Sequence, residues 1–179
     1  MALSVRDRVY EVGPCQEADL DDVVDIERRA FKAPWTRQIF LEELCREWAY
    51  LDVMRERPVD GTRERAVAFA NYWLVRDEVH ILNIATHTEQ RRRGHATRLL
   101  THVLEFAARH RCKYVTLEVR RSNQVALGLY RAHGFRVVGV RPNYYVEDRE
   151  DAIVMLFEFD PADPNRREHS GDPRERDPE

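Results

Sequence analysis

One stretch of the sequence, residues 78–100, joins an apolar segment, three consecutive arginines, a glycine and an amphipathic helix. Residues 78–86 have the β-branched and apolar content of a strand, and the apolar side chains after Gly94 recur with helical period. A strand, a tight turn and a helix N-terminus together form an anion site, because the first N–H groups of a helix lack partners and its dipole is positive there. Gly94 permits close approach of a phosphate, and the arginines at 91–93 add charge. The stretch therefore predicts a pyrophosphate site.

Other interpretations of this turn are tested by the rest of the sequence. An exposed turn with solvated arginines explains the charge run alone equally well. Rossmann and P-loop sites are not indicated, since the sequence has no GxGxxG and no Gly-Lys-Ser/Thr. Lys and Arg number 29 against 32 Asp and Glu, a formal net charge of −3. This balance disfavours direct nucleic-acid binding, which requires a broad basic surface.

The remaining elements indicate one α/β domain over residues 1–160. We expect a mixed, mostly antiparallel, twisted sheet of six to seven strands with helices on both faces. Strands are expected at 8–15, 50–57, 66–75, 78–86, 114–119, 135–140 and 152–159, and helices at 19–31, 36–48, 95–108 and 123–133. Thr36 is the expected N-cap of the second helix, and Gly134 the expected C-terminal stop of the last.

The segment after Asp160 differs sharply in composition. Residues 161–179 hold four of the eight prolines, no aromatic residue and many charges of both signs, so we expect a disordered charged tail. Three widely spaced cysteines without a CxxC pair suggest a reducing compartment and no metal site. No signal peptide or long apolar span is evident, and we expect a cytoplasmic protein without membrane contact, monomeric or weakly dimeric.

The turn 91–96, Arg-Arg-Arg-Gly-His-Ala, matches the (Gln/Arg)-x-x-Gly-x-(Gly/Ala) signature of the GNAT superfamily of N-acetyltransferases, and the predicted element order resembles that fold over residues 8–159. Further segments resemble one branch, the bacterial enzymes that acetylate the N-terminal alanine of the eighteenth small-subunit ribosomal protein. These segments are Ala-Pro-Trp-Thr at 33–36, Leu-Asn-Ile-Ala at 82–85, Leu-Glu-Val-Arg at 117–120, Ser-Asn at 122–123, Ala-Leu-Gly-Leu-Tyr at 126–130, His-Gly-Phe at 133–135, Pro-Asn-Tyr-Tyr at 142–145 and Glu-Asp-Ala at 150–152.

The resemblance implies acetyl-CoA as co-substrate, no metal, and a protein N-terminus, ribosomal in this branch, as acceptor. It further implies that Glu118 is the general base and Tyr130 the general acid. The implied coenzyme A contacts are the backbone of Ile84, Ala85 and Thr86 for the pantetheine arm, then Arg92, Arg93, Gly94, His95, Ala96 and Thr97 around the pyrophosphate, and Asn123 further along.

The chemistry of amide formation gives these two roles a reason. A protonated amine cannot attack a thioester, so a base must take a proton, directly or through water, and the departing thiolate needs a proton source. Glu118 is expected near a strand end among apolar neighbours. Each residue also has a structural interpretation: Glu118 as a solvent-side residue or ion-pair partner, and Tyr130 as a core aromatic.

The acceptor is less constrained by the sequence. Trp35, Tyr144 and Tyr145 are candidates for a groove that holds a peptide terminus, and core packing explains each nearly as well. Val146 stands where the branch usually has proline, and the hairpin 55–65 is longer and more charged than usual. Two alternative functions remain: acetylation of lysine side chains or small amines, and a non-catalytic acyl-CoA-binding regulatory module.

Overall fold

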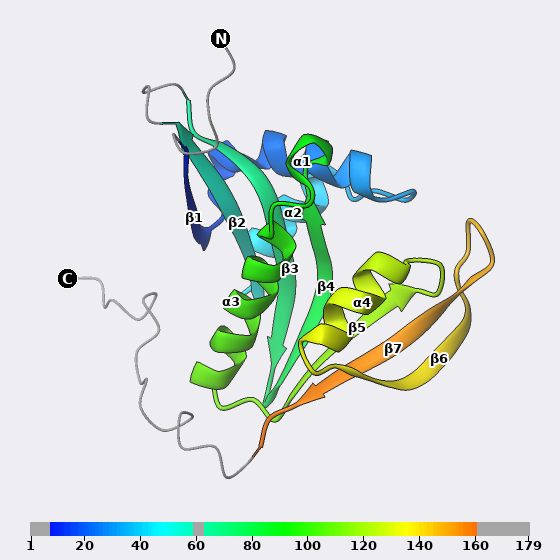
Figure 1. The fold of residues 1–179 in the computed structure, drawn as a ribbon. Coiled ribbons are helices and arrows are strands. Elements are labelled where there is room, and N and C mark those ends of the chain that lie inside the picture. Colours follow the sequence, from blue (N-terminus) through cyan, green and yellow to red (C-terminus); the bar gives the residue numbers. More distant parts are fainter. Residues whose placement is uncertain (1–7, 59–62, 161–179) are drawn as a thin grey trace.

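The computed structural model describes residues 8–58 and 63–160, which form one seven-stranded sheet flanked by helices (Figure 1). The predicted tail, 161–179, lies outside the described residues, as does the hairpin tip, 59–62. Within the described ranges, no helix has the length and apolar content that a membrane crossing requires. The elements are β1 (Arg8–Pro14), η2 (Glu17–Asp19), α1 (Leu20–Ala30), α2 (Arg37–Leu44), β2 (Ala49–Pro58), β3 (Arg65–Val75), β4 (Glu78–Thr86), η3 (Thr88–Gln90), α3 (His95–Arg109), β5 (Tyr114–Arg120), α4 (Gln124–Ala132), β6 (Arg136–Tyr145) and β7 (Glu150–Glu158).

The strands lie in the order β1-β2-β3-β4-β5-β7-β6, and every neighbouring pair is antiparallel except β4 and β5. Three antiparallel pairs are joined directly along the chain: β2 with β3, β3 with β4, and β6 with β7. The helix α3 provides the crossover that the parallel pair requires. This arrangement confirms the predicted mixed, mostly antiparallel sheet of six to seven strands.

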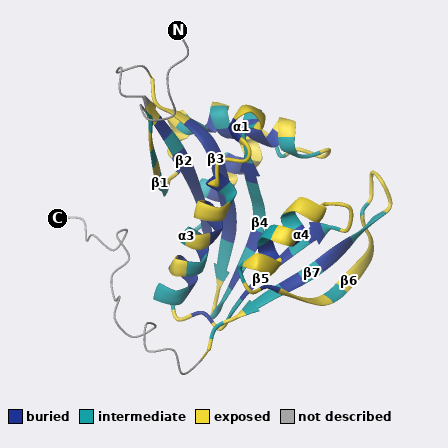
Figure 2. Cartoon of the chain, viewed as in Figure 1, coloured by how far each residue is buried: buried dark blue, intermediate teal, exposed yellow. Residues whose placement is uncertain are grey.

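Helices cover both faces of the sheet, also as predicted. One buried cluster joins α3 and α4 to the sheet, and a second joins α1 and α2 to the opposite face. Neighbouring residues of one strand belong to different clusters, because successive side chains of a strand point to opposite faces of the sheet. On β2, Met54 belongs to the first cluster and Val53 to the second. Figure 2 shows the central strands buried and the outer helix faces exposed. Burial on both faces explains why β3 is almost continuously apolar.

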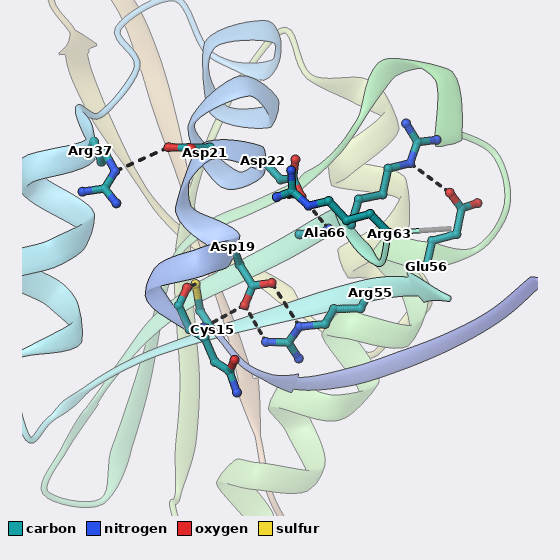
Figure 3. A network of polar contacts seen from close by, with 11 residues as sticks. Cys15, Asp19, Asp21, Asp22, Arg37, Arg55, Glu56, Arg63 and Ala66 are labelled. Carbon is teal, nitrogen blue, oxygen red and sulfur yellow. Dashed lines mark hydrogen bonds and ion pairs between the residues drawn. The ribbon is translucent and has the colours of Figure 1, made fainter. Parts of the chain in front are cut away.

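Polar contacts fix the first helix to the sheet (Figure 3). The Asp19 carboxylate accepts two hydrogen bonds from the Arg55 guanidinium of β2, at 2.5 and 3.1 Å. Asp22 in the first turn accepts the backbone N–H of Ala66 at the start of β3, at 3.0 Å. Burial, and then the nearby charge of Asp19, raises the pKa of the Cys15 thiol to about 12. The start of α1 is therefore tied to two strands.

The sequence predicts two boundaries incorrectly. The second helix is capped by the Thr36 hydroxyl as predicted, but it ends at Leu44 instead of Trp48. The strand expected at 135–140 extends further along the chain, because residues 142–145 also belong to β6. Proline is tolerated there because β6 is an edge strand and the pairing register shifts between Arg141 and Tyr145. Gly134, with φ of +88°, does follow the last helix as predicted.

Candidate active site

The central opening of the molecule lies where β4 and β5 separate. Their parallel register spans four pairs and ends at Ile81 opposite Leu117, and the strands then diverge towards their carboxyl ends (Figure 1). Leu82 is an extra residue of β4, because Asn71 of β3 faces Asn83 whereas the next residue of β3 faces Ile81. Such a bulge bends a strand away from its neighbour. The opening is therefore built into the backbone.

The predicted pantetheine contacts lie along one edge of this opening. Ile84, Ala85 and Thr86 follow the bulge and pair with β3 on their other side. In the described part of the chain, the register between β4 and β5 does not reach these residues. Their backbone groups on the β5 side are thus placed to hydrogen-bond a chain of amides inserted between the strands.

The arginine turn lies at the end of β4, where α3 begins. Gly94 is the N-cap residue of this helix in the left-handed region, with φ of +80° and open space where a Cβ would project. Residues 91–94 are exposed, as is Thr97. The first N–H groups of a 15-residue helix therefore face outward among arginines, which fits a pyrophosphate in charge and geometry.

The side chain of His95 is placed differently from its backbone. Its ring is buried, and its centroid lies 4.6 Å from that of Tyr10. Burial, and then the positive charges of Arg98 and Arg93, lower the pKa of His95, so the ring is neutral at pH 7. The predicted contact of His95 with a pyrophosphate is therefore supported for its backbone N–H only.

A buried carboxylate supports the turn from behind. Glu56 of β2 accepts hydrogen bonds from Arg8 at 2.5 Å, Arg65 at 3.0 Å, Tyr10 at 3.0 Å and Gln90 of η3 at 3.2 Å. Burial favours the neutral acid, but these donors outweigh it and hold the pKa of Glu56 below its usual range. The residue that immediately precedes the arginines is therefore fixed to the sheet.

Glu118 is the first residue of β5 beyond the last parallel pair, so its backbone marks the point of the opening. Its side chain is half-buried, and Oε1 lies 3.2 Å from Nη2 of Arg141 on β6. The carboxylate therefore has a charged partner, an arginine from a strand that lies two places away in the sheet. Glu118 is therefore an ion-pair partner, which is one of its two structural interpretations.

Tyr130 lies on the inner face of α4, where its ring packs 5.7 Å from Phe135. Burial, and then the neighbouring Tyr145, raises the pKa of Tyr130 to about 12. The pKa of Tyr145 is also raised to about 12, chiefly by burial and in smaller part by the charge of Glu118. Tyr145 therefore lies within electrostatic range of both predicted catalytic residues.

Asn123 is the N-cap residue of α4, and its Oδ1 accepts the backbone N–H of Ala126 at 3.1 Å. It lies three residues after the end of β5, on the second edge of the opening. The side-chain oxygen is therefore committed to the helix, which leaves the amide nitrogen as the group suited to a cofactor contact.

The turn between β6 and β7 is stiffened by Arg120. This guanidinium lies 3.9 Å from the ring centroid of Tyr145 and pairs with Asp148 at 2.8 Å and Glu150 at 3.0 Å. Hydrogen bonds from Ser122, followed by the Arg120 contacts, lower the pKa of Glu150 to about 2. Tyr144 projects nearby and is 45 % exposed, so it is available to a ligand.

Sequence reasoning missed Glu27, Arg120 and Arg141. Glu27 of α1 is 1 % exposed; it accepts the backbone N–H of Trp35 and the side-chain amide of Asn83. A charged residue on the otherwise apolar stripe of this helix is a signal that was present in the sequence. The two arginines gave no comparable signal, because their contacts join strands distant along the chain.

Comparisons with known proteins agree with this geometry. Residues 20–135 match the model of the acetyltransferase (GNAT) family. The ribosomal protein bS18-alanine N-acetyltransferase of Escherichia coli (strain K12) is 30% identical over 148 residues, 82% of this chain and 95% of that protein. An uncharacterized N-acetyltransferase of Methanocaldococcus jannaschii is 35% identical over 140 residues, 77% and 85% of the two chains.

Solved structures give the same result. The crystal structure of the ribosomal-protein-S18-alanine N-acetyltransferase from Escherichia coli superposes with a TM-score of 0.75 at 30% identity, covering 88% of this chain and 98% of the other. An Arabidopsis thaliana protein, NAA60, solved with acetyl-CoA, shares the fold at 21% identity with a TM-score of 0.74, covering 84% and 98%. The chain therefore belongs to the GNAT family and is, as its sequence predicted, an acetyl-CoA-dependent N-acetyltransferase.

Proposed function

We propose that this enzyme acetylates the N-terminal α-amine of a protein, most specifically the N-terminal alanine of a small-subunit ribosomal protein, in the cytoplasm. The observation that carries the proposal is the position of Glu118 at the point where β4 and β5 separate, with Tyr130 and Tyr145 close by. The similarity to bS18-alanine N-acetyltransferases over nearly their whole length supports the choice of acceptor.

In the proposed reaction the acceptor nitrogen forms a bond to the thioester carbonyl carbon while Glu118 takes its proton, directly or through water. The carbon–sulfur bond then breaks, and the thiolate of coenzyme A receives a proton from Tyr130. A pKa of about 12 keeps the Tyr130 hydroxyl protonated throughout the physiological range, so it can donate to the sulfur as negative charge develops. No covalent intermediate with the enzyme is required.

The ion pair with Arg141 gives the base a defined starting position. Because Arg141 is more than half exposed, its pairing with Glu118 is screened by solvent and easily exchanged. An incoming acceptor ammonium can replace the guanidinium at the carboxylate. The exchange would bring the acceptor nitrogen to the proposed base. The ammonium would pass one proton through the carboxylate to water before the neutral amine attacks, and Glu118 would take the second proton as the new bond forms.

The test is acetyl transfer to three matched peptides, followed by mass spectrometry that locates the acetyl group. The first begins with alanine and has a free α-amine, the second has a blocked terminus, and the third has a blocked terminus and an internal lysine. We expect labelling of the first alone. Equal labelling of the lysine peptide would contradict N-terminal specificity and support the lysine acetyltransferase alternative.

Variants test the two roles. Glu118→Gln and Tyr130→Phe are each expected to lower kcat by about 100-fold or more, the usual contribution of a positioned acid or base. Arg136→Gln is a control for the loss of an exposed ion pair, because Arg136 of β6 pairs with Glu158 of β7 and both side chains are more than half exposed. Unchanged turnover in Glu118→Gln, with acetyl-CoA still bound, would point to a different base.

A further inference from the structure

Glu27 is a buried acid that the proposed reaction does not use. Its carboxylate is 1 % exposed, and its Oε1 accepts the backbone N–H of Trp35 at 3.1 Å. The side-chain amide of Asn83 donates to both oxygens, at 3.2 and 3.1 Å. Both donors are neutral, and a buried carboxylate without a cationic partner is costly. A leucine would fill this place in the apolar stripe of α1 without that cost.

The donors belong to two segments that border the opening. Asn83 follows the bulged residue Leu82 and precedes the backbone predicted to hold the pantetheine arm. Trp35 lies in the connection 31–36 between α1 and α2, hereafter the acceptor loop, and its ring packs against Phe40 of α2 at 5.6 Å. Glu27 therefore joins this loop to β4, next to the residues predicted to hold the pantetheine arm.

The acceptor loop also reaches the opposite side of the opening. Lys32 of the loop pairs with Asp148 of the turn between β6 and β7, at 2.7 Å. Asp148 in turn pairs with Arg120, two residues after Glu118 on β5. The loop thus extends from β4 to the turn that follows Tyr144 and Tyr145 of β6. The ion pair at Lys32 is exposed and weak, whereas the hydrogen bond at Glu27 is buried.

Building on the proposed function, we propose that Glu27 is a positioning residue for the acceptor: it fixes the acceptor loop to β4 and so sets the width of the acceptor site. Glu27 does not touch the reacting atoms in this role. Its effect is expected in acceptor binding, while the cofactor contacts of the arginine turn, which Glu56 fixes to the sheet through Gln90, stay intact.

Two substitutions separate positioning from general structural support. Glu27→Leu removes the hydrogen bonds from Trp35 and Asn83 and keeps the packing. At pH 8 the loss of the buried charge offsets the two donors left without an acceptor, so the free energy of unfolding should stay near that of the wild type. Its KM for the alanine peptide should rise by about tenfold, the equivalent of one lost hydrogen bond to a charged group, while the KM for acetyl-CoA changes less than twofold. Glu27→Gln keeps an oxygen for the Trp35 N–H and should fall between the two.

Glu43→Leu is the matched control. Glu43 of α2 is equally buried, but it accepts hydrogen bonds from Trp73 of β3 and Arg46 near its own helix, so its loss leaves the acceptor loop attached. Wild-type acceptor KM in Glu27→Leu would overturn the proposal. Equal increases in both KM values together with lower stability would also overturn it, because they indicate a structural role alone.

Hydrogen exchange gives a readout that does not depend on the acceptor. Exchange across residues 31–36 should be faster in Glu27→Leu than in the wild type or Glu43→Leu, because the Trp35 amide loses its acceptor. If the wild type does not acetylate the alanine peptide, the proposed function fails while this measurement still decides whether Glu27 fixes the loop. Unchanged exchange would refute the proposal for any acceptor.

Discussion

The charge state of Glu27 makes a quantitative prediction about stability. Burial raises the pKa of this carboxyl from 4.5 to about 7, even though the hydrogen bonds from Trp35 and Asn83 oppose the rise. Each factor of ten in proton affinity corresponds to about 1.4 kcal/mol, so ionising Glu27 costs the folded state about 3 kcal/mol relative to the unfolded chain. The perturbation that removes this cost is Glu27→Gln.

The sign of the effect follows from proton binding. The folded state holds the Glu27 proton more tightly than the unfolded state, so the carboxyl favours folding below pH 4.5, and this contribution is lost as the pH rises to about 7. Other groups titrate in both proteins and cancel in the comparison. The free energy of unfolding of Glu27→Gln minus that of the wild type should therefore increase by about 2 to 3 kcal/mol between pH 5 and pH 8.5.

The assay is urea denaturation at several pH values, followed by the fluorescence of the three tryptophans. Glutamine also changes the hydrogen bonds at this site, which shifts the difference in free energy of unfolding by the same amount at every pH. The change of this difference with pH is therefore the quantity that tests the charge of Glu27. Glu150→Gln is a control, because hydrogen bonding from Ser122 and Arg120 lowers the pKa of Glu150 to about 2. Its difference from the wild type should stay flat between pH 6 and 8.5. Parallel profiles for Glu27→Gln and the wild type would refute the reasoning.

Three further predictions concern other parts of the molecule. Gly94→Ala should destabilise the protein by about 1 kcal/mol and weaken acetyl-CoA binding, measured by calorimetry, because an L-residue is strained at φ of +80° although its Cβ meets no atom. Native protein should react with iodoacetamide at Cys45 alone, with Cys15 and Cys112 labelled only after unfolding; mass spectrometry of peptides would detect early labelling of either buried thiol. Phe40→Ala should lower the free energy of unfolding by about 3 to 5 kcal/mol in urea, and a loss below 1 kcal/mol would contradict its place in the core.

The elements that the sequence predicted correctly are those with a local pattern. Helical period located α1 and α3, and alternation located β5, because burial of one face imposes these periods directly on the chain. The strand assignment failed at 142–145, where a proline and a left-handed Asn143 resemble a loop although an edge strand accepts both.

The candidate site divides in the same way. The anion-binding turn is continuous in sequence, so glycine, arginines and helix start could be read together. The surroundings of Glu118 depend on Arg141, 23 residues later and two strands away, and no local pattern encodes that contact. Glu27 was detectable as a charge on an apolar stripe, but its partners were not, because one of them is the backbone of Trp35.

The separation of β4 and β5 has a consequence for the whole molecule. Only four residue pairs join the strands on either side of this seam, so the sheet is two antiparallel ribbons held at one end. A cofactor whose amide arm lies between the two ribbons would bridge them. A ligand present at 100 times its dissociation constant adds about 2.7 kcal/mol to the free energy of unfolding. We therefore expect protease digestion of the purified protein to slow when acetyl-CoA is added.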